Sequence, residues 1–181
     1  MKVLIFNGSL DEEAFRTSRR IAQFYADQFT AVSVEVEQLH LSDYNIPIFQ
    51  AKLMDSVPED VQRFVEAFRA ADIMIWLTPL YHGGMTGVMK NAIDWLELTS
   101  KDTPAYLTNK VVGFTCWSGG NQAMQGIQSL DNVAKALRAW SLPFSVAISN
   151  ADLYENNDLS EVYKKKMEML ASLLVESKKQ F

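Results

Sequence analysis

The sequence predicts an α/β fold in which one parallel sheet has helices on both faces. Short, almost wholly apolar runs recur along the 181 residues, and such runs are typical of strands that are buried on both faces. Each run is followed by a longer stretch whose apolar residues have helical spacing. Three of the runs end in loops that contain glycine. Regular alternation of strand and helix indicates parallel strands joined by right-handed crossovers.

The first half of the chain is expected to hold three strands and two helices. The expected strands cover residues 2–6, 33–37 and 72–77. The second of them alternates apolar and charged residues, which favours the edge of the sheet. Thr17 or Ser18 can cap the first helix, and Pro58 suits the first turn of the second helix. The helical residues expected to face the core are Ile21, Phe24, Tyr25, Phe29, Val61, Phe64, Val65 and Phe68.

The second half is expected to add two strands, at 110–117 and 143–149, and three helices, the last at about 159–178. The residues expected to face inward are Met85, Val88, Met89, Ala92, Ile93, Leu96, Ala123, Ile127, Leu130, Ala134, Leu137, Leu159, Val162, Tyr163, Met167, Leu170 and Leu174. For five strands, the flavodoxin-like order 2-1-3-4-5 is the leading choice. It brings the loops after strands one, three and four to one pocket.

Composition and charge exclude several classes of function. Hydrophobic residues make up 48% and charged residues 22%, which predicts a single globular domain over residues 1–181. A net charge of −5 argues against nucleic acid as a partner. The apolar run at the N-terminus is too short for a signal peptide or a membrane span, so a cytoplasmic protein is expected. One cysteine and two separated histidines predict neither a disulfide framework nor a metal site.

The loop after the first strand has the features of a phosphate site. Its glycine, hydroxyls and fixed positive charge come from Gly8, Ser9, Arg16, Thr17 and Ser18. The N-terminus of the next helix adds N–H groups and a partial positive charge. Neither the dinucleotide fingerprint nor the P-loop is matched, so a mononucleotide is favoured; the alternative is a capped helix with a solvated arginine. Asp11, Glu12 and Glu13 oppose anion binding, and we expect these carboxylates to point outward to water.

The loops after the third and fourth strands suit a flat heterocycle. Residues 78–87 contain a proline and three glycines, so their backbone groups can approach the edge of a ring, with Tyr81 and His82 beside it. Residues 117–121 place two adjacent glycines after a buried strand, which suits backbone contact with a ligand. The alternatives are a packing role for Tyr81, an exposed loop histidine, and a tight turn into the next helix.

Residues 78–96 read TPLYHGGMTGVMKNAIDWL. This stretch resembles the signature of the NADPH-dependent FMN reductases, commonly T-P-E-Y-N-G-S-x-x-G-x-L-K-N-A-I-D-W-L, and the resemblance extends over nearly the whole chain. It implies a flavodoxin-like oxidoreductase that binds FMN non-covalently and uses NADPH or NADH as co-substrate. The implied electron acceptor is a small molecule such as a quinone, a free flavin, an azo compound or a metal oxyanion. Because the chemistry belongs to the flavin, no side chain is required as a nucleophile or base.

The same resemblance implies the residues of the site. Ser9, Arg16, Thr17 and Ser18 would hold the phosphate; Pro79, Leu80, Tyr81, His82 and Gly83 would wrap the isoalloxazine ring; Ser118, Gly119 and Gly120 would close the site. Many family members carry an arginine where this chain has Asp11, a departure that weakens the expected phosphate contact. Leu80 and His82 replace the usual glutamate and asparagine, and ring contacts there are expected from the backbone.

Family members are usually dimers or tetramers, so the resemblance also implies a homodimer or homotetramer. Met85, Met89 and Trp95 would suit an apolar contact between subunits. Two other functions remain open from the sequence. One is a flavodoxin-type electron carrier, since such carriers are small and acidic. The other is a non-redox binding protein on the same fold with a degraded phosphate loop.

Overall fold

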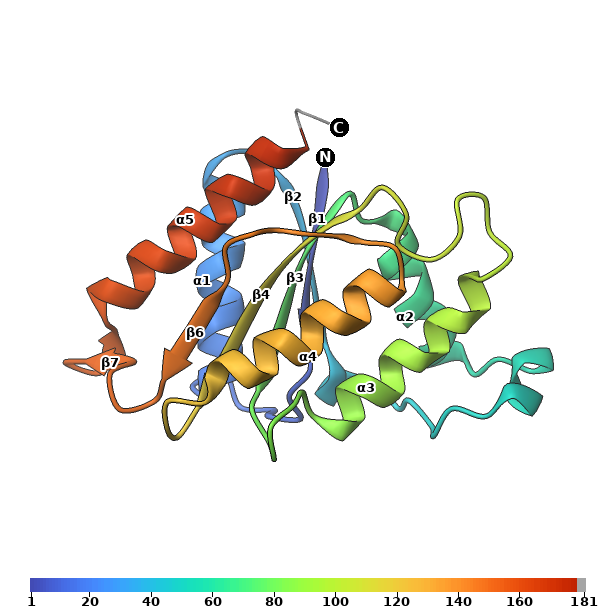
Figure 1. Ribbon diagram of the computed structural model, residues 1–181, viewed down its shortest axis with the longest axis horizontal. Coiled ribbons are helices and arrows are strands. Elements are labelled where there is room, and N and C mark those ends of the chain that lie inside the picture. The colour runs from blue at the N-terminus through green and yellow to red at the C-terminus, as the bar shows by residue number, and fades with distance from the viewer. Residues whose placement is uncertain (179–181) are drawn as a thin grey trace.

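One parallel sheet forms the centre of the molecule (Figure 1). The computed structural model describes residues 1–178. The strands are β1 (Lys2–Asn7), β2 (Glu35–His40), β3 (Ile73–Pro79), β4 (Val111–Ser118), β5 (Trp140–Ser141) and β6 (Val146–Ser149). Their order is β2-β1-β3-β4-β5, and β6 also pairs with β4. All of these pairs are parallel. The predicted fold and the order 2-1-3-4-5 are confirmed.

The fifth predicted strand is divided into two short pieces. β5 and β6 both pair with β4 and are separated by residues 142–145. Pro143 lies in the gap and has no N–H to donate to a ladder, which confines proline to edges and interruptions of sheets. The strand therefore starts earlier than the expected residues 143–149 and follows β4 as two segments along the sheet edge.

Helices cover both faces of the sheet. α1 (Thr17–Ala31) and α5 (Glu161–Ser177) lie on one face, and α2 (Glu59–Ala70), α3 (Gly87–Asp94) and α4 (Ala123–Ala136) lie on the other (Figure 1). Successive side chains of a strand point to opposite faces. Leu4 and Phe6 accordingly belong to the core under α2, α3 and α4, whereas Val3 and Ile5 belong to the core under α1 and α5.

Three details of the helices differ from the prediction. The N-cap of α1 is Arg16, without a side-chain cap bond, so the prediction that Thr17 or Ser18 caps the helix is wrong. Both hydroxyls bond to other side chains instead. Val88 and Val162 were expected to face inward but are 38% and 62% exposed. Both lie in the first turn of their helix, where the packing against the sheet has only begun.

Several short elements have no counterpart in the prediction. A hairpin of β7 (Tyr154–Glu155) and β8 (Asp158–Leu159) precedes α5, and 3-10 turns occur at η1 (Leu41–Asp43), η2 (Ala51–Asp55) and η3 (Trp95–Thr99). α3 ends at Asp94 and continues as η3, so the residues expected in one helix belong to two elements. No helix within residues 1–178 is both long enough and apolar enough to cross a lipid bilayer.

Candidate functional site

Three loops meet at the carboxyl ends of β1, β3 and β4, the lower edge of the sheet in Figure 1. The register places Asn7 opposite Leu77. Two backbone bonds then join the start of a loop to the end of the neighbouring strand. The Gly8 N–H donates to the Leu77 carbonyl at 2.8 Å, and the Leu80 N–H donates to the Trp117 carbonyl at 2.8 Å. The site residues expected from the sequence lie in these loops, at the last residue of β3 or β4, or at the N-cap and first turn of α1.

Thr86 fastens the loop after β3 to the loop after β1. Its buried hydroxyl donates to the Gly8 carbonyl at 2.6 Å and accepts from the Met89 N–H at 3.1 Å, which caps α3. Its N–H donates to Thr78 Oγ1 at 3.3 Å. A Cβ on Gly8 would lie only 2.4 Å from Met89 Sδ, so the contact requires glycine. Sequence reasoning missed Thr86, although a threonine just before a helix is a usual N-cap.

The loop after β3 has a tight two-residue turn at its tip. Tyr81 and Gly84 exchange two backbone hydrogen bonds of 3.1 Å. Between them, His82 and Gly83 have φ angles of 49° and 85°, as both central residues of a type I′ turn do. Within residues 1–178 the N–H groups of His82 and Gly83 have no acceptor. Tyr81 is 62% exposed. The tip therefore offers two N–H groups and an aromatic ring to a ligand.

The neighbouring residues of this loop face the protein. Leu80 packs against the core and gives its N–H to Trp117. The Pro79 carbonyl accepts from Thr78 Oγ1 at 2.9 Å, and proline has no N–H. Contacts of these two residues with a ligand are therefore limited to carbonyl oxygen and ring carbons.

The loop after β4 is open at its glycines. Ser118 is buried, and its hydroxyl donates to the Gly120 carbonyl at 2.5 Å. A Cβ on Gly119 would meet no atom within 4 Å, so the backbone there can be approached from outside. The Ser118 carbonyl accepts from the Asn150 N–H at 2.9 Å. Ser118 thus shapes the turn, and Gly119 presents the accessible backbone.

The start of α1 leaves several N–H donors available. Among the described residues, no group accepts from the N–H of Thr17, Ser18 or Arg19 in its first turn. Free N–H groups at a helix N-terminus, with the positive end of the helix dipole, suit an anion. Ser9 is buried directly after β1 and close in space to Ser18, since both are bonded to Asp11. The structure therefore brings the predicted Ser9 and Ser18 together.

Asp11 is partly buried and its carboxylate is bonded to a serine, so the prediction of three outward carboxylates is wrong for this residue. The Ser18 hydroxyl donates to Asp11 Oδ2 at 3.1 Å, and the Asp11 N–H donates to Ser9 Oγ at 3.2 Å. Serine hydroxyls on both sides hold the residue in place. Glu12 and Glu13 are exposed, as expected. One carboxylate therefore lies beside the free N–H groups of α1.

The two arginines nearest this loop are already paired. Arg16 forms an exposed ion pair of 3.0 Å with Glu13, and its guanidinium lowers the pKa of that carboxyl. Arg19 forms a 2.5 Å pair with Asp43. The Thr17 hydroxyl is turned to the β7–β8 hairpin, 2.9 Å from the Tyr154 hydroxyl. Of the residues expected at the phosphate, Arg16 and Thr17 thus have their side chains bonded elsewhere.

A buried histidine supports the turn after β1. Asn7 Nδ2 donates to His40 Nδ1 at 2.9 Å, and Asn7 Oδ1 accepts from the Ser9 N–H at 3.1 Å. His40 Nε2 lies 3.1 Å from Gln38 Oε1, so Nε2 carries the proton. Burial, with a contribution from Arg19, lowers the pKa of His40 to about 4. A neutral imidazole therefore fixes Asn7, which fixes Ser9. Sequence reasoning missed Asn7 and its bond to His40.

The helix after the glycine loop holds a distant loop in place. Asn91 accepts from the Phe49 N–H at 2.8 Å and donates to the Pro47 carbonyl at 3.0 Å, and Trp95 Nε1 donates to the same carbonyl at 2.9 Å. Met89 and Trp95 are fully buried. The expectation that they form a subunit contact is therefore wrong, because their surfaces are already used inside the core. This explains the asparagine and the tryptophan of the stretch 78–96 within a single chain.

A hollow of about 290 Å³ lies between the loop around Pro47 and the start of α3. It is lined by Leu10, Leu41, Tyr44, Asn45, Ile46, Ile48, Gly87, Val88 and Asn91. Leu10 belongs to the loop after β1, so the hollow adjoins the candidate site. Leu10 and Ile48 are 57% and 71% exposed. The rim of the hollow is therefore an exposed apolar surface beside the three loops.

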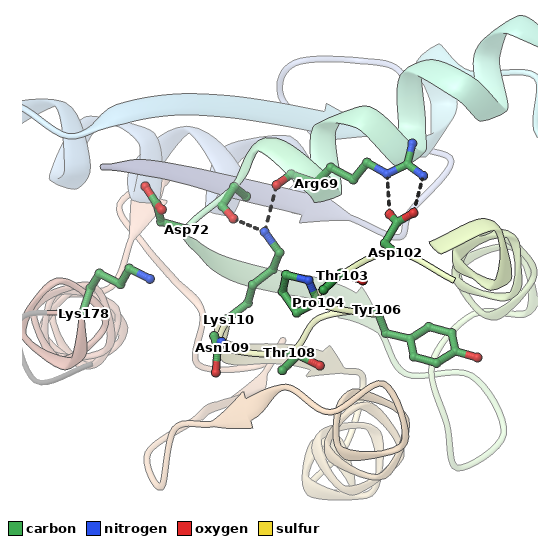
Figure 2. A pocket seen from close by; sticks show the side chains of 11 residues that line it. Arg69, Asp72, Asp102, Thr103, Pro104, Tyr106, Thr108, Asn109, Lys110 and Lys178 are labelled. Atoms are coloured by element: carbon green, nitrogen blue, oxygen red, sulfur yellow. Dashed lines mark hydrogen bonds and ion pairs between the residues drawn. The ribbon is translucent and has the colours of Figure 1, made fainter. Parts of the chain in front are cut away.

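A second hollow, of about 440 Å³, lies at the opposite edge of the sheet (Figure 2). Lys110 crosses it, and its ammonium donates to the carbonyls of Arg69, at 2.9 Å, and Ala71 at the end of α2. Burial lowers the pKa of Lys110. Arg69 is held by both carboxylate oxygens of Asp102 (Figure 2). Arg69 and Asp102 thus bond to each other, and Lys110 bonds to the carbonyls at the end of α2, far from the three loops.

Comparison with known proteins agrees with this arrangement. The model of the NADPH-dependent FMN reductase family matches residues 1–152. An NAD(P)H-dependent FAD/FMN reductase of Geobacillus thermodenitrificans is 31% identical over 70% of this chain and 65% of its own length, just under two thirds. An FMN-dependent NADPH-azoreductase of Staphylococcus aureus is 27% identical over 87% of this chain and 82% of its own.

The fold is likewise shared with a solved structure. The flavoenzyme NAD(P)H:(acceptor) oxidoreductase FerB from Paracoccus denitrificans superposes with a TM-score of 0.79 at 19% identity, over 99% of this chain and 97% of that one. At this identity the likeness concerns the fold alone. The family match covers most of the sequence, including all three loops. The chain therefore belongs to the NADPH-dependent FMN reductase family, and the predicted family, enzyme class and flavin cofactor are confirmed at that level.

Proposed function

We propose that this protein takes a hydride from NADPH or NADH and passes the electrons to a small acceptor such as a quinone, a free flavin, an azo compound or a metal oxyanion, with FMN held across the three loops. The observation that carries the proposal is the joining of these loops at one edge of the sheet. The Thr86 hydroxyl and the N–H groups of Gly8 and Leu80 fix the spacing of the loops. Among residues 1–178, N–H groups without an acceptor collect at the start of α1 and at the tip of the loop after β3.

The chain offers groups for both ends of the flavin. At the phosphate end, the donors are the Ser9 and Ser18 hydroxyls and the first-turn N–H groups of α1, with Thr17 beside them. Arg16 would join them if its exposed pair with Glu13 opened. At the ring end, Pro79 and Leu80 supply carbonyls and apolar surface, and His82 and Gly83 supply N–H groups. Tyr81 flanks the ring, and Ser118, Gly119 and Gly120 close the other side. These residues fit FMN, except that Asp11 lies among the phosphate donors.

When bound, FMN supplies the redox chemistry, accepting a hydride from a reduced nicotinamide and returning electrons to an acceptor. The N–H groups of His82 and Gly83 would hold the edge of the ring, with Tyr81 beside it. At that position they would stabilise negative charge on the ring. Cys116 takes no part as a nucleophile, because it is buried and its burial raises the pKa of the thiol to about 12.

The direct test is an absorbance spectrum of the purified protein reconstituted with FMN, followed by anaerobic titration with NADPH and NADH separately. Bleaching of the flavin band by either nicotinamide, and its return on adding a quinone or an azo dye, is the expected result. Flavin that binds but is bleached by neither nicotinamide would indicate an electron carrier. Failure of FMN to bind would contradict the proposal.

We further propose that the chain works as a single domain over residues 1–181 and as a homodimer or homotetramer. The support for an oligomer is the exposed apolar rim of Leu10, Ile48 and Val88 around the hollow beside α3. Light scattering at micromolar concentration tests the oligomeric state, and a mass of one chain would contradict it.

The reaction consumes reduced nicotinamide, which favours a cytoplasmic location. The proposed partners are small molecules rather than nucleic acid or membrane.

A further inference from the structure

We propose that Asp11 is a specificity-determining residue, which makes the site bind riboflavin about as tightly as FMN. The inference rests on the proposed flavin site. It concerns only the group at the far end of the ribityl chain, which is a neutral hydroxyl in riboflavin and a phosphate in FMN. The turn after β1 and the start of α1 are where this end of the flavin would lie.

Asp11 is fixed in that place by three hydrogen bonds. The Ser18 hydroxyl donates to its carboxylate at 3.1 Å, its N–H donates to Ser9 Oγ at 3.2 Å, and Arg19 Nε donates to its carbonyl at 3.2 Å. Arg19 is itself held by Asp43 and by Ser42 Oγ at 2.8 Å. The carboxylate is therefore part of a fixed network, in contrast to the exposed Glu12 beside it.

The carboxylate changes which ligand groups the site can satisfy. An ionised carboxylate only accepts hydrogen bonds, and a phosphate dianion also only accepts them. The two repel each other and compete for the Ser18 hydroxyl and the N–H groups of α1. A terminal hydroxyl can instead donate to Asp11 and accept from a free N–H of the first turn. The chemistry at this position thus suits a hydroxyl at least as well as a phosphate.

Nearby positive charge offsets Asp11 only in part, because the Arg16 guanidinium attracts the Asp11 carboxylate but both arginines near this loop are paired with other carboxylates. The Arg16 guanidinium is paired with Glu13 at 3.0 Å, and that of Arg19 is paired with Asp43 at 2.5 Å. The Arg16–Glu13 pair is exposed and can open at little cost. Because this pair lies in water, the charge of Arg16 is screened. The Arg19 side chain is only 18% exposed and already donates to three residues.

The experiment compares the dissociation constants of FMN and riboflavin by quenching of flavin fluorescence. The variants are Asp11→Asn, which removes the charge but keeps the shape, and Glu12→Gln, which removes one charge from the adjacent exposed residue. For the wild type we expect the two constants to agree within about fivefold. Asp11→Asn should tighten FMN by about tenfold, as expected when one charged contact changes, and leave riboflavin within about threefold. Glu12→Gln should change neither by more than about twofold.

The outcomes separate this inference from the proposed function. If the wild type binds FMN about a hundredfold more tightly than riboflavin and Asp11→Asn does not alter the ratio, the role of Asp11 is refuted while a flavin site stands. If Glu12→Gln has the same effect as Asp11→Asn, general loop charge and not the Asp11 contact sets the ratio, which also refutes it. If neither flavin binds to any of the three proteins, the proposed function fails and this inference fails with it.

Discussion

Single side chains decide the shape of the three loops, and most of them are small and polar. Thr86 bonds to the Gly8 carbonyl in another loop, whereas Asn7 and Ser118 each bond to a backbone group two residues ahead in their own turn. Buried hydroxyls and amides of this kind cost stability unless they are bonded, so each one fixes the backbone that it touches. The sequence pointed to Ser9 and Ser18 as polar groups beside a glycine. It did not reveal that Asp11 would bond to both, because that contact depends on the path of the loop.

The role of Thr86 can be tested with an isosteric change. Thr86→Val keeps the volume but leaves the Gly8 carbonyl and the Met89 N–H without partners. We expect the free energy of unfolding to fall by about 1–3 kcal/mol, and flavin to bind more weakly because the loops after β1 and β3 separate. Urea unfolding and fluorescence titration measure the two effects. Thr86→Ser, which keeps the hydroxyl, should be close to the wild type; equal stability of the valine variant would refute the role.

A pair of glycines tests the close packing at the turn after β1. In Gly8→Ala the new methyl group would overlap Met89, whose Sδ lies 2.4 Å from the ideal Cβ position. Forcing α3 away should cost about 1–3 kcal/mol of stability. Gly87→Ala is the matched control, because a Cβ there meets no atom within 4 Å. Thermal unfolding should show a loss for the first variant and no loss for the second; similar values for both would contradict the packing argument.

The secondary-structure elements were predicted in type and order but not in their ends. The divided fifth strand, the early end of α3 and the β7–β8 hairpin all depend on contacts between segments far apart in the chain. Asn91 of α3 and Trp95 of η3 are an example, since they hold the loop at Pro47. Periodicity finds the apolar face of a helix, but the last turn is decided by which groups donate to its terminal carbonyls.

The end of α2 supplies a test of such a contact. Lys110→Met keeps an apolar stem but removes the ammonium that donates to the Arg69 and Ala71 carbonyls. We expect a loss of about 1–3 kcal/mol of stability, with flavin affinity unchanged because the site lies at the other edge of the sheet. Lys135→Met, which removes an exposed ion pair with Asp131, should cost less than about 1 kcal/mol. Chemical unfolding distinguishes them, and equal losses would show that Lys110 adds no more than a surface charge.

At the scale of the whole molecule, a side chain on which stability depends lies at the same edge of the sheet as the candidate site, where β1 and β2 end. His40 lies there, and its pKa falls from the ordinary 6.5 to about 4 on folding. The unfolded chain takes up a proton below pH 6.5, and the folded chain does so only near pH 4. The stability that neutral His40 provides is therefore complete above pH 6.5 and is lost as the pH falls toward 4.

Acid unfolding measures this contribution. Between pH 7 and pH 5 the wild type should lose about 2 kcal/mol through His40. His40→Gln, which keeps an acceptor for Asn7, should be less stable at pH 7 but should lose about 2 kcal/mol less over the same interval. Urea unfolding at the two pH values gives both numbers. The same pH dependence in the two proteins would show that His40 is not the group responsible.

The sequence by itself determined the class of fold, the order of the strands, the family and the three loops that form the candidate site. These follow from local patterns, since an apolar run, a helical spacing and a glycine after a strand are each visible within a few residues. The tertiary structure decided which groups meet within those loops. It showed that Asp11 lies among the phosphate donors, that the arginines are paired elsewhere, and that Met89 and Trp95 are buried. Hydrogen bonds and ion pairs depend on distances of a few ångströms between residues far apart in the chain, and only the packed sheet and helices set those distances.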